Sequence, residues 1–100
     1  MNWDSDAKDA PLEVSLTAVE TFEEYYRRDY RSLVGLAYVL TGSQFAAEDL
    51  VQDALTTANK KWSSIASYDN PGAWVRRVMV NKSTSRFRKL QTEARTLTSL

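Results

Sequence analysis

The chain has 100 residues, 43% of them hydrophobic and 11% aromatic, with no cysteine and no histidine. That length suits one packed domain and not two cores, and the missing residue types exclude disulfides, thiolate metal sites and histidine-based catalysis. The formal charge is zero, yet residues 1–59 hold 11 acids and 4 bases, whereas residues 60–100 hold 2 acids and 9 bases. This sorting predicts one surface for a cationic partner and another for an anionic partner.

The first residues differ in composition from the rest. Residues 1–18 alternate acids with small residues and contain Pro11, which predicts a mobile acidic arm. Apolar residues near the end of this arm are compatible with a short additional helix that packs against the core. No apolar run is long enough for a membrane span, and the acidic start does not fit a secretory signal. We therefore expect a cytoplasmic protein that does not enter a membrane.

Two helices are predicted in the acidic half. Thr21 followed by Glu24 forms a capping box, and apolar residues at helical spacing then run to Gly42, which predicts a helix over Phe22–Thr41. Ser43 caps a second helix, which we expect to reach about Trp62. Its acidic and amide side chains fall outside its apolar stripe, and they are Glu48, Asp49, Gln52 and Asp53.

A third helix is predicted in the basic half. Ser63–Asn70 shows no sustained period and is expected to be a loop. Asn70 followed by Pro71 is a strong helix start, and the helix should continue to about Leu90, with fraying or a linker beyond Gln91. The expected fold is all-α, a compact bundle of three main helices with a short fourth at the N-terminus.

The third helix carries one face suited to nucleic acid. At about 100° per residue, Arg77, Asn81, Thr84 and Arg88 share a side, with Trp74 at one border and Arg76 at the other. The arginines suit phosphates, and the amide and hydroxyl suit base edges. An ordinary solvated surface is the alternative for this face, which the absence of acids weakens. Asn81 is a poor mid-helix residue, so a specific role is favoured, with a structural role as the alternative.

The second helix presents the opposite charge. Its acidic face suits a basic helical partner, although a plain solvated face is the alternative reading of this segment. No histidine and no phosphate-binding glycine loop accompany these carboxylates, so we do not expect an enzyme, a cofactor or a metal site.

Three motifs occur in order: Leu40-Thr41-Gly42, Ala47-Glu48-Asp49-Leu50-Val51-Gln52-Asp53-Ala54, and Ala73-Trp74-Val75-Arg76-Arg77-Val78-Met79-Val80-Asn81. Together they resemble region 2 of the extracytoplasmic-function sigma factors of bacterial RNA polymerase, and the last motif is similar to an actinobacterial subgroup. The resemblance covers about residues 22–89. It implies a sigma region 2 domain over 19–92, with 93–100 beginning a linker to a region 4 that we expect to be absent from this chain.

The resemblance also implies partners. The acidic residues of the second helix would dock on the clamp helices of the largest subunit of core polymerase. Lys61, Ile65 and Asn81 match the pocket that captures a flipped, single-stranded base of the non-template strand at the minus-ten promoter element. The strand backbone would be held by Arg76, Arg77, Arg86 and Arg88. An anti-sigma factor is a further partner common in this family.

The sequence departs from the family at two positions of the third helix. Members often carry an apolar residue at Lys82 and an aromatic one at Arg86.

Two rival functions remain open. A duplex-binding helix-turn-helix regulator needs a tight turn before a recognition helix, but Gly42 is followed by an acidic helix. A helical protein-interaction module without nucleic acid is the second rival.

Overall fold

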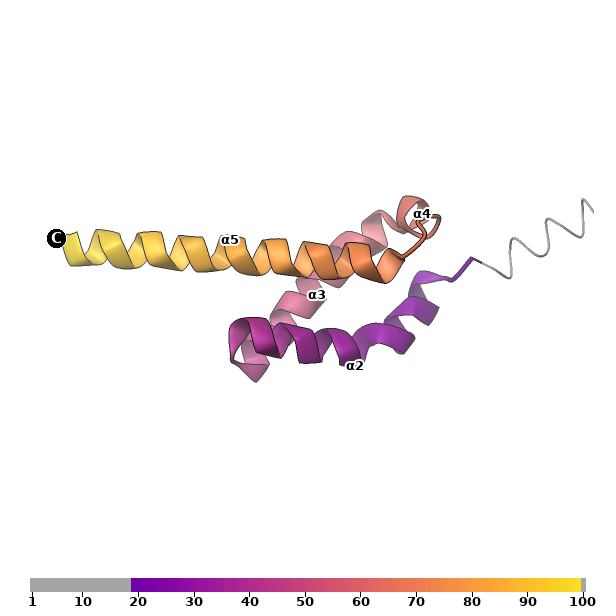
Figure 1. Cartoon of the computed structure of the whole chain (residues 1–100), viewed down its shortest axis with the longest axis horizontal. Coiled ribbons are helices and arrows are strands. Elements are labelled where there is room, and N and C mark those ends of the chain that lie inside the picture. Colours follow the sequence, from indigo (N-terminus) through magenta and orange to yellow (C-terminus); the bar gives the residue numbers. More distant parts are fainter. Residues whose placement is uncertain (1–18, 100) are drawn as a thin grey trace, which may run out of the picture.

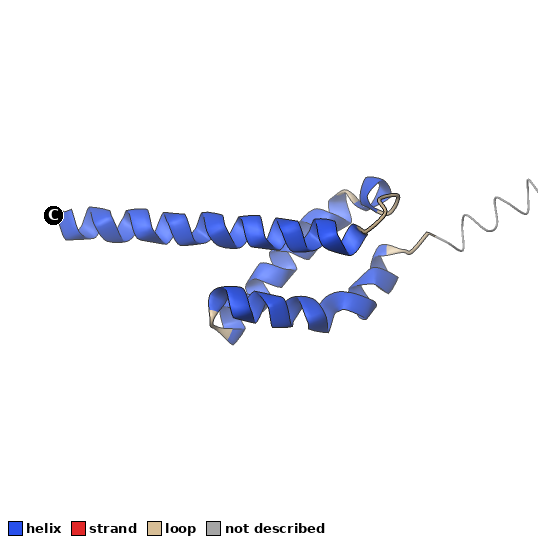
Figure 2. Cartoon of the chain, in the orientation of Figure 1, coloured by secondary structure: helices blue, strands red, loops and turns tan. Residues whose placement is uncertain are grey.

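The computed structural model describes residues 19–99 and contains four helices in that range. Figure 1 shows them as α2 (Phe22–Thr41), α3 (Gln44–Lys60), the single turn α4 (Trp62–Ile65) and α5 (Pro71–Ser99). Short loops join the helices, and this part of the chain contains no strand (Figure 2). The all-α class and the three main helices are thus confirmed. The expected N-terminal arm and the additional helix before the core fall in residues 1–18, outside the described range.

Helix α2 begins and ends where its signals predict. The N–H of Glu24 donates to Thr21 Oγ1 at 3.1 Å, and the N–H of Thr21 donates to Glu24 Oε1 at 3.0 Å. At the other end Gly42 adopts φ 73°, a left-handed conformation that glycine enters without steric cost. Its N–H donates to the carbonyl of Tyr38 at 2.7 Å. Both ends therefore satisfy backbone groups that a helix leaves unpaired.

Helix α3 is shorter than expected, and part of the expected loop is helical. The Ser43 hydroxyl accepts the N–H of Ala46 at 3.2 Å, as a cap should. The regular dihedrals stop at Lys61, whose φ is −112°, so Trp62 starts α4 instead of ending α3. The carbonyl of Lys61 then accepts the N–H of Ile65 at 3.0 Å. Only the segment after Ile65 is non-helical before Pro71.

Helix α5 extends beyond the expected end near Leu90 and reaches Ser99. The Asn70 side chain accepts the N–H of Ala73 at 3.0 Å, which caps its start. All of its buried residues, Gly72, Val75 and Met79, lie in its first third. The second half projects past α2 and α3 (Figure 1). Most of its side chains are exposed, although Phe87, Leu90 and Leu97 recur there at helical spacing.

The core lies where α2, α3 and α5 meet, and each of these helices contacts the other two. Its fully buried members are Tyr25, Leu33, Ala37, Ala47, Leu50, Val51, Ala54, Leu55, Ala58, Ile65, Val75 and Met79. Helix α3 supplies half of them, because it contacts both of the other helices and buries a broad stripe. The polar and charged side chains of the described residues stay outside this core.

An aromatic cluster fixes α4 against the start of α2. The ring of Trp62 lies 5.6 Å from that of Phe22 and 5.2 Å from that of Tyr25, centroid to centroid. The Trp62 indole N–H also donates to the carbonyl of Glu20 at 2.9 Å. Because buried aromatic pairs contribute beyond their apolar area, this cluster holds the segment that leads into α5. None of the helices between residues 19 and 99 is long and apolar enough to cross a membrane.

Candidate functional site

The predicted nucleic-acid face of α5 is present and accessible. All four of its members, Arg77, Asn81, Thr84 and Arg88, are exposed. The buried side of the same helix carries Val75 and Met79, so the periodic packing of α5 turns the other four outward. Two guanidinium groups, an amide and a hydroxyl thus share one open face, which we call the α5 outer face. Such a set can contact phosphates and base edges.

The two residues at the borders of this face are less accessible. Trp74 packs against the core and is half-buried, and Arg76 is half-buried as well. The space above Gly72 is narrow, because a Cβ at this glycine would lie 3.1 Å from Arg76 Nη1 and 3.1 Å from Asp29 Oδ2. The guanidinium group of Arg76 therefore lies over the first turn of α5 and close to α2.

The expected base pocket is only partly formed by surface residues. Lys61 is exposed at the junction of α3 and α4. Ile65 is only 1% exposed and belongs to the core, so its side chain offers no surface to a base in this conformation. Ile65 ends the helical turn α4, in a segment expected to be a loop, and packs into the core, which is the physical reason for the difference. Ile65 instead supports the loop whose Tyr68 is 46% exposed.

The acidic face of α3 is on the surface, as expected. Glu48, Asp49 and Gln52 are exposed, and Asp53 is half-exposed. Glu48 accepts a hydrogen bond from the Gln44 amide at 2.8 Å within the helix. The Gln52 amide donates to the Tyr26 hydroxyl of α2 at 3.2 Å.

Two carboxylates of this face are engaged by α5. Arg86 donates from Nη2 to Asp53 Oδ2 at 2.7 Å, and its Nη1 lies 3.3 Å from Asp49 Oδ2. Lys82 Nζ lies 3.4 Å from Asp53 Oδ1. We call these four residues the α3–α5 ion-pair cluster. Arg86, expected beside the other arginines of α5, therefore faces α3 and not the α5 outer face.

Sequence reasoning did not assign Lys82 to any site, although a signal was present. Asp49 and Asp53 are four residues apart on one helix, and Lys82 and Arg86 are four residues apart on another. Side chains at this spacing share a helix face, so two such pairs of opposite charge can meet across an interface.

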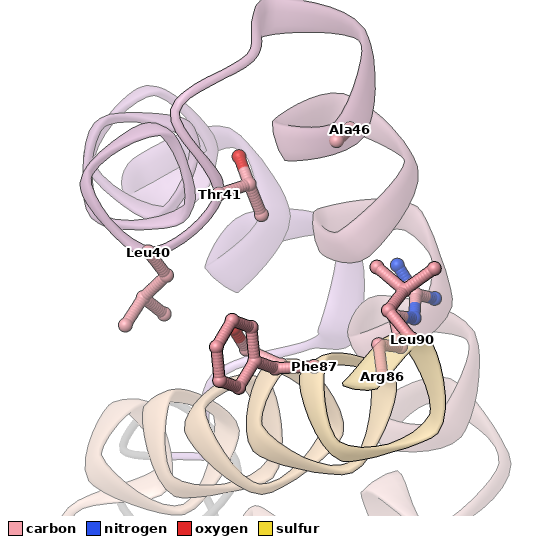
Figure 3. A pocket seen from close by; sticks show the side chains of 7 residues that line it. Leu40, Thr41, Ala46, Arg86, Phe87 and Leu90 are labelled. Carbon is pink, nitrogen blue, oxygen red and sulfur yellow. The ribbon is translucent and has the colours of Figure 1, made fainter. Parts of the chain in front are cut away.

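The ion-pair cluster borders an apolar cavity of about 200 Å³ at the turn between α2 and α3 (Figure 3). Its lining residues are Leu40, Thr41, Ala46, Ser83, Arg86, Phe87 and Leu90. Phe87 and Leu90 are 61% and 64% exposed, so this cavity is an open groove. Figure 3 shows the ring of Phe87 pointing toward Leu40 and Thr41.

Residues 19–99 hold no group of three acidic, histidine or cysteine side chains that could bind a metal. Burial raises the pKa of Tyr25 above its ordinary value, and the nearby charge of Asp29 raises it further. Within the described residues its hydroxyl has no hydrogen-bond partner. It is a core residue and faces neither candidate surface.

The comparisons with known proteins identify the class. The family model for Sigma-70 region 2 matches residues 25–93, and the chain belongs to that family. The resemblance seen in the motifs is thereby confirmed.

Two curated relatives carry the name RNA polymerase sigma-E factor. The relative from Streptomyces avermitilis is 39% identical over 72 residues, which cover 70% of this chain and 40% of the relative. The relative from Streptomyces coelicolor is 38% identical over 72 residues, which cover 70% of this chain and 41% of the relative. The chain thus spans about two fifths of the length of these proteins. No solved structure matches it significantly.

Proposed function

We propose that this chain is an RNA polymerase sigma factor domain that docks on core polymerase and captures the non-template strand of the minus-ten element. The acidic face of α3 contacts the basic clamp helices, and the α5 outer face holds single-stranded DNA. The domain performs no chemistry itself and works in the cytoplasm, where it meets polymerase. The observation that carries the proposal is the α5 outer face, which exposes Arg77, Asn81, Thr84 and Arg88 together without an acid.

A further feature supports a single-stranded target. The segment before α5 exposes Tyr68. Aromatic side chains that lie near arginine and lysine side chains suit unstacked nucleotides. Base capture costs a few kcal/mol of unstacking, which contacts in the loop and on α5 must offset. On this proposal Lys61 and Asn81 contact the captured base, while Arg76, Arg77 and Arg88 contact phosphates.

The rivals predict different binding. A duplex-binding regulator would prefer double-stranded fragments, and a pure protein-interaction module would bind neither form of DNA. The test is a pull-down of core RNA polymerase with the chain, followed by footprinting of the complex on forked promoter DNA. We expect protection of the single-stranded minus-ten segment. Retention of polymerase without such protection would exclude the DNA part of the proposal, and absence of retention would exclude the docking part.

A further inference from the structure

The later part of α5 carries a row of apolar side chains that the fold leaves uncovered. Phe87, Leu90 and Leu97 are 61%, 64% and 71% exposed, and Val80 earlier on the same helix is 41% exposed. Single exposed apolar residues are ordinary, but a contiguous row of them marks an interaction surface. A helical stretch without tertiary packing is also only marginally stable in water. The row therefore indicates a contact that one copy of the chain does not make alone.

The spacing of this row is that of a coiled coil. Its members recur alternately three and four residues apart, as the a and d positions of a heptad repeat do. We call them the α5 seam, and they are Val80, Ser83, Phe87, Leu90, Ala94 and Leu97. The seam is separate from the α5 outer face, because Leu90 follows Arg77 by thirteen residues and so lies about 140° from it around the axis. Such a seam packs against a second helix.

Part of the seam also forms the groove at the turn between α2 and α3. Ser83, Phe87 and Leu90 line this cavity of about 200 Å³ together with Leu40 and Thr41 (Figure 3). Small-molecule sites usually have volumes of roughly 300–1,000 Å³, so this groove suits inserted side chains better than a ligand of that size. A helix that lies on the seam would enter the groove at one end and follow the projecting part of α5 at the other.

We propose that the α5 seam is covered by the α5 seam of a second copy of this chain, with the two helices antiparallel. In this arrangement each a position of one copy faces a d position of the other. The facing pairs are Val80 with Leu97, Ser83 with Ala94 and Phe87 with Leu90. All three pairs are symmetric about one point in the middle of the seam, so a single two-fold axis forms them together. The inference goes beyond the proposed function and does not depend on it.

Charge favours the antiparallel arrangement. Arg86 and Glu93 flank the seam on the same side, so antiparallel packing places Arg86 of each copy beside Glu93 of the other. Glu93 is exposed and forms no ion pair within residues 19–99, and the side chain of Arg86 is still 39% exposed. A parallel pair would instead place Arg86 near Gln91 and Glu93 near Thr98, which gives no ion pair.

Position along the helix favours the same arrangement. The folded part of each copy lies beside the first half of α5, and the second half projects past α2 and α3 (Figure 1). Antiparallel packing lays the projecting half of each copy along the groove of the other. The layer beside the groove pairs two small side chains, Ser83 and Ala94, which lets the second helix come close where the turn between α2 and α3 lies.

Sedimentation of the unaltered chain tests the pair. We expect a monomer–dimer equilibrium with a Kd on the order of 100 μM, because a short seam gains little beyond the cost of association. Leu90→Lys should raise this Kd about tenfold. The control Val39→Lys alters a side chain of α2 that is 79% exposed, and it should leave the Kd unchanged. A chain that stays monomeric up to about 1 mM, or equal effects of the two variants, would overturn the inference.

A charge reversal tests the flanking pairs. Glu93→Arg places like charges beside each other twice in the dimer, so the Kd should rise about threefold at low salt and by less at high salt. The control Asp69→Arg makes the same change in net charge in the exposed loop before α5. Urea unfolding of each variant checks that the monomer remains folded. Equal changes of the Kd in Glu93→Arg and Asp69→Arg would overturn the inference.

Disulfide cross-linking tests the direction of the helices. The chain has no cysteine, so an introduced one reports a single position. A mixture of Ser83→Cys and Ala94→Cys should form mixed disulfide dimers under mild oxidation, since these positions face each other. A mixture of Ser83→Cys and Thr92→Cys is the control and should form few, because Thr92 lies off the seam. Equal yields in the two mixtures, or faster cross-linking of Ser83→Cys with itself, would overturn the inference. Neither polymerase nor DNA enters these tests, so the proposed function stands or fails separately.

Discussion

Arg86 of α5 donates a hydrogen bond of 2.7 Å to Asp53 of α3, so a residue of the basic half and a residue of the acidic half lie in direct contact. Arg86 and Arg77 are nine residues apart on the same helix, which places them about 180° apart around its axis. The two arginines therefore have different environments: Arg77 is exposed on the α5 outer face, and Arg86 lies against α3. Each surface can consequently be tested by its own set of variants.

Asn81→Ala tests base recognition. We expect the variant to lose about 1–3 kcal/mol of discrimination at one promoter position, because the amide supplies a paired donor and acceptor. Competition between oligonucleotides that differ at single positions measures this. The control Ser85→Ala removes a neighbouring exposed hydroxyl and should keep the discrimination. A uniform loss across all sequences would show that Asn81 does not read a base.

Arg77→Ala tests the phosphate contact. Affinity for DNA should fall to a similar extent on every sequence, and the slope of log affinity against log salt should become shallower by about 0.7, the value for one phosphate contact on a single strand. The measurement is a salt titration of oligonucleotide binding. Arg95→Ala is the control, since this arginine lies near the end of α5, beyond the proposed site. An unchanged slope would remove Arg77 from the set of phosphate contacts.

Gln52→Ala tests docking on polymerase. Association with core polymerase should weaken by about 1 kcal/mol, the worth of a typical hydrogen bond, while binding of single-stranded DNA stays the same. Competitive binding against labelled chain measures this. Because Gln52 donates to the Tyr26 hydroxyl, Tyr26→Phe is the informative control. A loss of equal size in Tyr26→Phe would mean that Gln52 acts only by ordering α2 against α3.

Tyr25→Phe tests the buried hydroxyl. Its removal leaves no polar group unsatisfied, so the free energy of unfolding at neutral pH should stay equal or rise by about 1 kcal/mol. Since burial raises the pKa of Tyr25, the unfolded chain releases the phenol proton near pH 10 while the folded chain retains it. The stability from this group is therefore complete below about pH 10 and is lost as pH rises further.

The check is urea unfolding between pH 7 and pH 11. The unaltered chain should lose stability above about pH 10 more steeply than Tyr25→Phe. Tyr38→Phe is the control, because Tyr38 is 50% exposed and its removal should leave the steep loss in place. Parallel curves for the unaltered chain and Tyr25→Phe would contradict the assigned environment of Tyr25.

Amide exchange should divide α5 into two parts. Val75 and Met79 are buried in the core, whereas Gln91–Ser99 have no buried side chain. A helical segment without tertiary packing is marginally stable in water, so its amides should exchange orders of magnitude faster than those of the first part. Hydrogen–deuterium exchange read by NMR measures this. Equal protection along the whole helix would show that a further contact covers the second part.

The helix starts and stops could be predicted from the sequence because they depend on local chemistry. The Thr21–Glu24 box and the left-handed Gly42 give α2 the bounds Phe22–Thr41 that their side chains and dihedrals require. The periodic basic face of α5 could be predicted for a similar reason, since a helix repeats every 3.6 residues. These features need no knowledge of what packs against what.

Long-range contacts could not be predicted in this way. The burial of Ile65 depends on how α4 packs against α2 through Trp62, and the position of Arg86 depends on where α3 crosses α5. The end of α5 was placed too early because the threonines and serines beyond Gln91 indicated a linker, although Leu90 and Leu97 keep the helical spacing of apolar residues. Charge counts predicted two surfaces, but they did not predict that Lys82 and Arg86 pair with the acidic face of α3.

Half of the buried side chains of α3 are alanines. Ala47, Ala54 and Ala58 are each fully buried on it. A single methyl group at these positions sets how near the neighbouring backbones can come, and packed interiors do not absorb added volume freely. Replacing one of these alanines by leucine would push α3 away from the helix that packs on it. The separation between the acidic face of α3 and the α5 outer face thus depends on three of the smallest buried side chains of the domain.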